Sequence, residues 1–421
     1  MTSTRNARTA VTRQRIVEAA HELFVTQGYR STSLRDIAAA ASVSHPGLLG
    51  HFASKDVLLA EVVALFEQDN ADVFDLAVAA AEPGALMFSE LAARNATTPG
   101  YLELFAALTG EASAPGHPSH ERMRERYANM RALTIDALQD AVDLGVIAPD
   151  RDVEAETTRA IAGWDGLQLM AQYLPDRVDV VEMLEERESL WAMPLGWRDP
   201  AEQPPAEERT GALPELTLSG PDDGEDESGY AAGRRRRAQI LADAMQLFAR
   251  SGYGDTSLRD IAQAVGVSKS TLLHHYPTKE ALLGAVLTER DKAIRMQGEA
   301  TEARRAADLL RGMPAGARRN AADEPGLIEV YAVLSCEAVP SSHPAHAYFE
   351  NRFARSVDYF AEVFRLAQVD GDLPAHRDPE REAIWLIALW DGLQYQWLYD
   401  RNAVDIAAQL HAHLEDVLPR R

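Results

Sequence analysis

The chain has 421 residues, 46% of them apolar and 25% charged, and this length predicts at least two domains of a globular protein. No apolar run reaches the roughly 20 residues that span a bilayer, residues 1–15 lack the apolar segment of a secretory signal, and the one cysteine, Cys336, excludes an intrachain disulfide, so we expect a cytoplasmic protein. The formal net charge of −23 argues against a nucleic-acid partner only if the acids are spread evenly.

The charge is not spread evenly. Residues 196–229 hold ten acids, five prolines and only two arginines, a composition that predicts an extended, solvated linker. Residues 1–56 and 233–280 instead carry more cations than anions, and the second segment opens with Arg234-Arg235-Arg236-Arg237. Two basic segments are therefore set in an acidic chain.

The sequence repeats itself almost completely. Residues 13–59 recur at 237–283 with a constant offset of 224 residues, and later stretches, such as Trp164-Asp165-Gly166-Leu167-Gln168 and residues 390–394, align with an offset of 226. A repeat of this length is far longer than a solenoid unit of roughly 20–50 residues. The chain is therefore interpreted as two copies of one protein fused head to tail.

The first copy begins with a predicted amphipathic helix whose apolar positions recur at helical spacing from Ile16 to Phe24. Gly28 is expected to end it. Thr32-Ser33 three residues before Asp36 predicts a capped second helix to about residue 41, and Ser44 is expected to cap a third from His45 to about residue 52. A fourth helix is predicted to open at Lys55.

The second copy repeats this scheme, with a stop at Gly252, a cap at Thr256-Ser257 and a third helix from Lys269 to Tyr276. Two short helices joined by a tight turn behind a longer helix form a helix-turn-helix unit, whose last helix enters the major groove of DNA. The alternative is an ordinary hairpin in a helical bundle. The caps, the turn spacing and the basic flank coincide in both copies, which favours the helix-turn-helix.

Apolar helices follow each head, including one through Trp164 and the next through Met183. We therefore predict an all-α protein of two tandem units, each a head and a helical body. The predicted boundaries are 1–56 for the first head, 57–195 for its body, 196–232 for the linker, 233–280 for the second head and 281–421 for the second body.

Three motifs present in both copies resemble the tetracycline-repressor (TetR) family of bacterial transcription factors. They are Leu-Phe-x3-Gly-Tyr, Thr-Ser-Leu-Arg-Asp-Ile-Ala, and Val-Ser-x3-Leu-Leu-x-His-Phe/Tyr followed by a lysine. The resemblance implies an all-α protein with a DNA-binding head controlled by an effector bound in the body. Family members are homodimers of one-copy chains, so a fused pair departs from the usual arrangement.

By this resemblance, the start of the third helix meets base edges. These residues are His45, Pro46 and Gly47 in copy one, and Lys269, Ser270 and Thr271 in copy two; the caps before them, Ser44 and Ser268, are also expected to contact DNA. Phosphate contacts are expected from Thr32, Ser33, His51, Lys55, Thr256, Ser257, His274, His275 and Lys279. Ordinary solvent exposure is the alternative for each polar residue.

Two departures from the family pattern concern the recognition helices. Leu49 and Leu273 occupy the position usually held by a phosphate-binding tyrosine, and Gly50 stands where copy two has His274. Pro46 also offers no side-chain hydrogen bond. Copy one is therefore expected to be the weaker and less discriminating reader of DNA.

Polar and aromatic residues on the apolar body helices are the predicted effector site. In copy one these are Glu103, Phe105, His117, Arg126, Tyr127, Trp164, Gln168 and Tyr173, and in copy two Glu329, Tyr331, His343, Arg352, Phe353, Trp390, Gln394 and Tyr399. The alternative is packing for the two tryptophans and a turn for the His-Pro pairs. We expect a small, largely apolar effector of unknown identity.

These observations predict a ligand-responsive regulator, a repressor by the family resemblance, whose halves associate as a pseudo-dimer on double-stranded operator DNA with unlike half-sites. The alternatives are a scaffold in which only copy two contacts DNA, and a homodimer with four heads. No catalytic triad, Gly-rich phosphate loop or Cys/His metal spacing is present, so we expect no enzyme activity, cofactor, metal or membrane partner.

Overall fold

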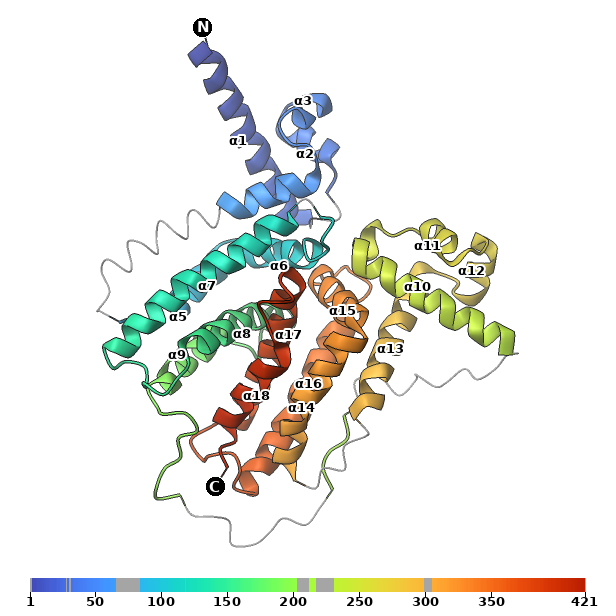
Figure 1. Ribbon diagram of the computed structural model, residues 1–421. Coiled ribbons are helices and arrows are strands. Elements are labelled where there is room, and N and C mark those ends of the chain that lie inside the picture. Colours follow the sequence, from blue (N-terminus) through green and yellow to red (C-terminus); the bar gives the residue numbers. More distant parts are fainter. Residues whose placement is uncertain are drawn as a thin grey trace.

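The computed structural model describes residues 2–27, 29, 32–65, 84–117, 119–202, 212–216, 231–298 and 305–420. Every regular element in this described part is a helix, which confirms the predicted all-α class. Among the same residues, no helix combines the length and apolar character needed to span a bilayer. Figure 1 shows two small helical heads, one blue and one yellow, projecting from a larger helical body.

The two copies build the same elements in the same order. Copy one contains α1 (Thr2–Gln27), α2 (Leu34–Ala40), α3 (His45–Leu49), a helix over residues 55–65, α5 (Phe88–Thr97), α6 (Tyr101–Glu111), α7 (His120–Asp143), α8 (Val153–Tyr173) and α9 (Val180–Trp191). Copy two contains α10 (Ala231–Asp255), α11 (Leu258–Val265), α12 (Lys269–His275), α13 (Lys279–Gly298), α14 (Ala306–Asp323), α15 (Pro325–Glu337), α16 (His346–Val369), α17 (Pro379–Tyr399) and α18 (Ile406–Val417). Thus α1 corresponds to α10, and α9 to α18.

The helix ends in the heads follow the predicted stops with one exception. Gly252 interrupts α10 with φ 68°, a backbone region that favours glycine, where the sequence predicts the stop. Its equivalent Gly28 lies outside the described residues. α3 ends at Leu49, before the predicted end at Phe52, because the poor helix former Gly50 follows.

The two bodies pack against each other along α8 and α17, which are equivalent helices. A Cβ on Gly166 would lie 1.9 Å from the carbonyl oxygen of Ala388, and one on Gly392 would lie 1.8 Å from that of Ala162. Only glycine lets two helix backbones approach this closely. The glycine of the repeated Trp-Asp-Gly segment is therefore the residue at which the two copies cross.

A second contact locates the symmetry between the copies. Gly110 and Cys336 are equivalent positions, and a Cβ on Gly110 would lie 2.6 Å from the Cβ of Cys336. A residue touches its own equivalent only close to a two-fold axis. The copies are thus related by a pseudo-two-fold axis near α6 and α15. Cys336 is buried there, and burial raises the pKa of its thiol to about 12.

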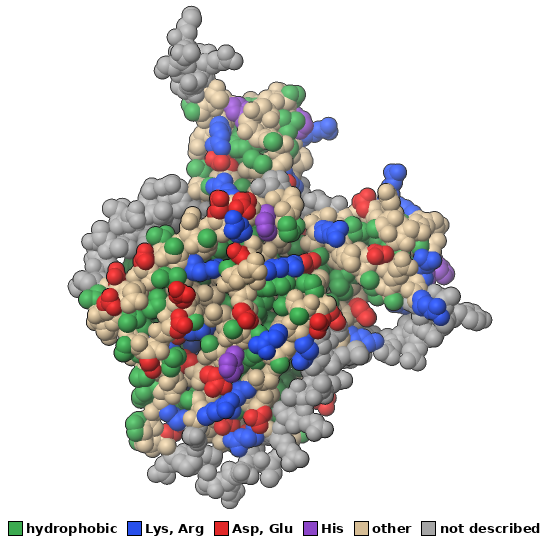
Figure 2. All heavy atoms as spheres, viewed as in Figure 1, with side chains coloured by type: hydrophobic (Ala, Val, Ile, Leu, Met, Phe, Trp, Pro, Cys, Tyr) green, Lys and Arg blue, Asp and Glu red, His purple; other side chains and the backbone are tan. Residues whose placement is uncertain are grey.

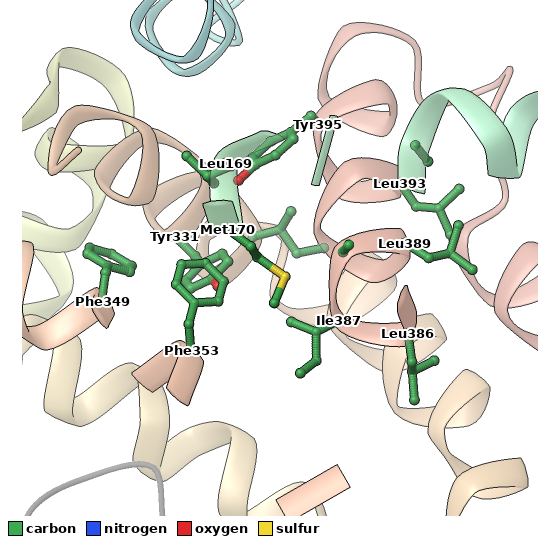
Figure 3. Packing of buried hydrophobic residues seen from close by; sticks show 14 of the residues in the cluster. Leu169, Met170, Tyr331, Phe349, Phe353, Leu386, Ile387, Leu389, Leu393 and Tyr395 are labelled. Atoms are coloured by element: carbon green, nitrogen blue, oxygen red, sulfur yellow. The ribbon is translucent and has the colours of Figure 1, made fainter. Parts of the chain in front are cut away.

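The hydrophobic core is shared between the copies. Figure 3 shows Leu169 and Met170 of α8 among copy-two side chains such as Phe353 and Ile387. A second cluster forms the core of the first head and includes Tyr399 from copy two. Neither body therefore has a core made only of its own residues.

The first residues of the predicted linker lie against copy two. Trp197 packs edge-on to His376, with ring centroids 4.9 Å apart. An apolar indole gains by leaving water, which accounts for this contact at the edge of an otherwise polar segment. Most of the remaining linker, residues 203–211 and 217–230, lies outside the described residues.

Candidate DNA interface and effector site

Serine caps position the helices of both helix-turn-helix units. The side chains of Ser33, Ser257, Ser44 and Ser268 accept hydrogen bonds from the backbone amides of Asp36, Asp260, Gly47 and Thr271 at 3.2, 3.2, 3.1 and 3.1 Å. The carboxylates of Asp36 and Asp260 accept bonds from the amides of their caps in return, which completes a capping box in each copy. The predicted caps are all confirmed.

The recognition helix of copy one, α3, presents few polar side chains. Pro46 and Gly47 are exposed, His45 is half-buried, and Leu49 is exposed. Only the imidazole of His45 can form a side-chain hydrogen bond from the first three positions. The residues predicted to meet bases therefore lie at an open helix start that is poor in donors.

The recognition helix of copy two, α12, is richer in polar groups. Lys269 and Ser270 are exposed and Thr271 is half-buried. The Oγ of Ser268 lies 2.8 Å from both the Oγ of Ser270 and the Oγ1 of Thr271. This hydroxyl cluster and the exposed side chain of Lys269 offer several donors and acceptors at the helix start.

Thr32 and Thr256, both predicted to contact phosphate, are buried instead. The hydroxyl of Thr32 donates to the carbonyl of Leu23 at 3.3 Å, and that of Thr256 donates to the carbonyl of Gly252 at 2.7 Å. Each side chain links the end of the first helix to the start of the second. Phosphate binding by these hydroxyls stays a prediction that would need them to turn outward.

The two lysines predicted to bind phosphate have internal partners. The Nζ of Lys55 donates to the carbonyls of Tyr29 and Thr32 at 3.1 and 3.2 Å, and that of Lys279 donates to the carbonyl of Gly254 at 3.3 Å. Each ammonium also lies over a tyrosine ring, at 4.4 and 4.1 Å. These lysines close the end of the head's first helix, a role that sequence reasoning missed.

The three histidines at the ends of the recognition helices have different surroundings. His51 is half-buried, His274 is exposed, and the rings of His274 and His275 meet edge-on with centroids 5.5 Å apart. Burial, with His274 and nearby arginines, lowers the pKa of His275. Phosphate contacts by these three histidines, which lie at the carboxyl ends of the recognition helices or just after them, stay a prediction.

Two arginines support the recognition helices from behind. The guanidinium of Arg13 lies 4.9 Å from the ring centroid of Phe52, and that of Arg237 lies 5.4 Å from the ring centroid of Tyr276. The Nε of Arg237 also donates to the hydroxyl of Tyr276 at 3.2 Å. Figure 2 shows Lys and Arg side chains on both heads. Part of the basic flank is therefore structural.

The two heads match one known family at equivalent positions. The sequence model for bacterial regulatory proteins of the tetR family matches residues 16–62 and again residues 240–286. Both heads are helix-turn-helix domains of the TetR family. The chain carries this domain twice, as a tandem duplication, and each match covers one helix-turn-helix head with the start of the helix that follows.

Known relatives align with one copy. The HTH-type transcriptional repressor KstR2 of Rhodococcus jostii is 29% identical over 116 residues, which are 28% of this chain and 49% of KstR2. The regulator TtgR of Pseudomonas putida is 25% identical over 185 residues, 40% of this chain and 83% of TtgR. The structure of a TetR-family regulator from Agrobacterium tumefaciens is 20% identical, with a TM-score of 0.41 over 44% of this chain and 99% of that one. The chain thus spans half of the first relative, and KstR2 and TtgR are named as a transcriptional repressor and a transcriptional regulator.

In the first body, the predicted residues Phe105 and Arg126 pack against each other beside a buried acid. The guanidinium of Arg126 lies 4.6 Å from the ring centroid of Phe105, and the hydroxyl of Tyr127 donates to Asp165 at 2.8 Å. Burial raises the pKa of Asp165 to about 6, although Arg126 and the hydrogen bond oppose the rise. Asp165 was missed as a site residue, and its signal was an acid repeated on an apolar helix.

The second body repeats this arrangement with more hydrogen bonds. The hydroxyl of Tyr331 donates to Asp391 at 2.9 Å and accepts a bond from Arg352 at 3.0 Å. The Nε of Arg352 also donates to Asp291 at 3.3 Å. Burial raises the pKa of Asp391 to about 6. Tyr331 and Arg352, both named as candidate effector residues, therefore lie together with two carboxylates that the sequence did not single out.

The predicted residues Trp164, Gln168, Trp390 and Gln394 lie one turn apart on α8 and α17. Trp164 is half-buried and meets Phe88 edge-on with centroids 6.1 Å apart, while Gln168 and Gln394 are buried. The side chain of Gln394 donates to the carbonyl of Trp390 at 3.5 Å, within its own helix. These contacts favour the packing alternative for the tryptophans over effector binding.

His343, another predicted effector residue, joins the second head to its body. Its Nε2 lies 3.9 Å from the Oε1 of Glu337, and its ring meets Tyr253 edge-on with centroids 5.2 Å apart. The carboxylate of Glu337 accepts bonds from the amides of Tyr253 and Gly254 at 2.5 and 2.6 Å. The end of α10 is thereby held to the end of α15.

His117 has the same position in copy one. Its Nε2 lies 3.9 Å from the Oδ1 of Asp56, and this interaction lowers the pKa of Asp56 to about 2. Ligand atoms of Asp56, Glu111 and His117 lie within 4.8 Å of one another, close enough to share a cation. The copy-two equivalent of Glu111 is Glu337, whose carboxylate binds the end of the first helix of the second head. This cluster is therefore better explained as a junction between the first head and its body.

Two tyrosines cross from each copy into the other. Tyr173 donates to the carbonyl of Ser335 at 2.5 Å, and its equivalent Tyr399 donates to the carbonyl of Thr109 at 2.6 Å. The ring of Tyr399 lies 5.4 Å from that of Tyr127, which holds Asp165, so copy two reaches the buried acid of copy one. The ring of Tyr173 lies 5.3 to 6.0 Å from two copy-two phenylalanines, Phe353 and Phe349.

Proposed function

We propose that this chain is a ligand-responsive, DNA-binding transcriptional regulator, in the simplest case a repressor, that acts as a single-chain pseudo-dimer on an operator with unlike half-sites. The reciprocal insertion of Tyr173 and Tyr399 carries this proposal. Each body buries a hydroxyl from the other copy, so a body that separated from its partner would lose part of its interior. The two heads therefore belong to one unit.

The unequal recognition helices support unlike half-sites. Copy one offers one imidazole at the positions that precede Leu48, whereas copy two offers an ammonium and two hydroxyls ahead of Leu272. Lysine donates to guanine O6 and N7, and hydroxyls bond to several bases. A half-site bound by copy two should therefore be more strictly defined than one bound by copy one.

The buried acids support effector sensing in the bodies. Asp165 lies beside Arg126 and Tyr127, and Tyr127 packs against Tyr399 of the other copy. A small ligand that displaced these side chains would change contacts within one body and across the pseudo-two-fold axis at once. Through the junction of His117 with Asp56, the same body also touches its own head.

The test is the solution mass of the complex with operator DNA. The chain has a mass of 46.2 kDa, and one chain per operator is expected, on a site selected from random DNA. Two chains per operator, or selection of a perfect palindrome, would contradict the single-chain pseudo-dimer. Because both heads are present in either case, the same measurement leaves the assignment as a DNA-binding regulator intact.

The alternative is that copy two alone contacts DNA, or that two chains present four heads. The exposed Pro46 and Gly47 favour the first alternative, because they offer almost no side-chain hydrogen bonds. Footprints separate the three arrangements. One protected half-site supports copy two alone, two supports the pseudo-dimer, and four supports the four-headed dimer.

A further inference from the structure

A buried ion network lies where the two copies meet, among residues of α8, α9, α17 and α18 and the turns that precede α8 and α17. Arg151 lies 2.9 Å from Glu156, and its equivalent Arg377 lies 2.7 Å from Glu382. Asp416 lies 3.5 Å from Arg151 and 3.2 Å from Arg377, so one carboxylate serves both arginines. Because all five residues are buried, each charge depends on its partners rather than on water.

The rest of this network is not symmetric. Arg159 of copy one is replaced in copy two by Trp385, Arg187 by His413 and Leu190 by Asp416. The guanidinium of Arg187 lies 3.4 Å from Glu382 and 4.2 Å from the ring centroid of Trp385. Arg159 lies 3.0 Å from Glu156 of its own copy and donates to the side-chain oxygen of Gln409 of copy two at 3.1 Å. The differing residues thus make their contacts at the boundary between copies.

These differences leave the two copies with opposite net charges within this buried network. Copy one contributes three arginines and one glutamate, whereas copy two contributes one arginine and two carboxylates. Burial and the nearby Arg187 lower the pKa of His413 to about 3, so this residue adds no charge at neutral pH. Pairing two copy-one bodies would bring six arginines against two glutamates. Pairing two copy-two bodies would bring four carboxylates against two arginines.

Shape differs between the copies in the same region. A Cβ on Gly163 would lie 2.6 Å from the indole of Trp385, so the tryptophan fits only because glycine is there. The copy-two equivalent of Gly163 is Leu389. If two copy-two bodies paired in this geometry, each Trp385 would meet a leucine side chain. Overpacking of this kind in a closed interface is destabilising.

We propose that the differences at Arg159/Trp385, Gly163/Leu389, Arg187/His413 and Leu190/Asp416 specify pairing of a copy-one body with a copy-two body. Charge disfavours pairing of copy one with itself, and both charge and shape disfavour pairing of copy two with itself. Specificity of this kind is a difference between the free energies of right and wrong pairs. The surface between the copies therefore fits one partner, the unlike half.

This inference rests on the proposed pseudo-dimer, but it can fail separately. In the Gly110→Cys variant of the full chain, the new thiol faces Cys336 across the pseudo-two-fold axis, after a shift of about 1 Å to reach disulfide geometry. After oxidation with copper phenanthroline, peptide mass analysis should find only the 110–336 disulfide. A 110–110 or 336–336 disulfide would overturn the pairing rule.

Electrophoresis of the same sample tests the pseudo-dimer. A 110–336 bridge within one chain supports both the rule and the single-chain unit, whereas the same bridge between two chains keeps the rule and overturns the single-chain unit. The wild-type chain, which has Cys336 alone, should form no interchain bridge.

A rescue experiment tests the network without new thiols. The Asp416→Leu variant has leucine at this position, as copy one has at Leu190. It leaves Arg151 and Arg377 without their shared carboxylate, so the thermal unfolding midpoint should fall by about 5–10 °C. Adding Leu190→Asp supplies a carboxylate from the other copy, and at least half of the loss should return. An Asp416→Leu chain as stable as wild type, or no recovery in the double variant, would contradict the proposal.

Discussion

Ser42 and Gly266 occupy the same position in the turns of the two helix-turn-helix units, and both have a left-handed backbone, with φ of 53° and 71°. Ser42 is the one residue other than glycine with positive φ among the described residues. For a residue with a Cβ this conformation costs roughly 1–2 kcal/mol, whereas for glycine it does not. The head with the poorer recognition helix therefore also has the more strained turn.

Substitution at this turn should act in opposite directions in the two heads. Ser42→Gly should raise the free energy of unfolding by about 0.5 kcal/mol, because the relief of strain exceeds the entropy that glycine adds to the unfolded chain. Gly266→Ala should lower it by about 1 kcal/mol, although a Cβ there would meet no atom within 4 Å. Urea denaturation measures both, and changes of the same sign would count against strain as the cause.

The local geometry of the heads could be predicted because it depends on residues close in sequence. The capping boxes of Ser33 and Ser257 and the caps Ser44 and Ser268 involve partners three residues away. The same reasoning missed the contacts of Lys55 with the carbonyls of Tyr29 and Thr32. These partners are more than 20 residues away in the sequence, and a position at a helix start does not show which distant segment packs against it.

Contacts between the copies were harder to predict, since periodicity describes one helix at a time. Tyr173 and Tyr399 were expected to line pockets in their own copies, but each hydroxyl bonds to the other copy. A usable signal was present in Gly166 and Gly392. Glycine in a helix interior costs about 1 kcal/mol relative to alanine. Its repetition at the same position of two apolar helices therefore indicated that another backbone packs closely against each helix there.

Asp165 should make the stability of the protein depend on pH. Burial raises its folded-state pKa to about 6 from an ordinary value of 3.8, so the folded state binds the proton more tightly. Its contribution is therefore greatest below about pH 4 and is lost as the pH rises through 6. Asp165→Asn keeps an acceptor for Tyr127 without the charge, and should be more stable than wild type by about 1–3 kcal/mol at pH 7.

The measurement is the unfolding free energy of wild type and Asp165→Asn between pH 4 and pH 7.5. The difference between the two proteins should be small at pH 4 and should grow with pH. Asp391→Asn, in the equivalent site, should behave alike because burial also raises the pKa of Asp391 to about 6. A difference that stays constant or shrinks with rising pH would show that these acids are ionised at little cost.

The crossed tyrosines should contribute to stability through their hydroxyls. Tyr173→Phe leaves the buried carbonyl of Ser335 without this donor, and Tyr399→Phe does the same for Thr109, so each should cost about 1–2 kcal/mol. Tyr359→Phe is a matched control, because the ring of Tyr359 packs edge-on to its neighbour Phe360 in the same copy. If denaturation shows an equal loss of unfolding free energy in all three variants, the hydrogen bonds between the copies have no special part in stability.

The two recognition helices should differ in their effect on DNA affinity. In a DNA-shift assay on a selected operator, Lys269→Ala should weaken binding by about 1–3 kcal/mol, roughly 5- to 150-fold, because a base contact and a positive charge are lost together. Lys269→Arg is the control, since it keeps the charge and can still donate to guanine. His45→Ala should cause a smaller but measurable loss. No loss with His45→Ala would mean that copy two alone contacts DNA, whereas equal losses would mean that the two heads, despite their different side chains, contribute alike.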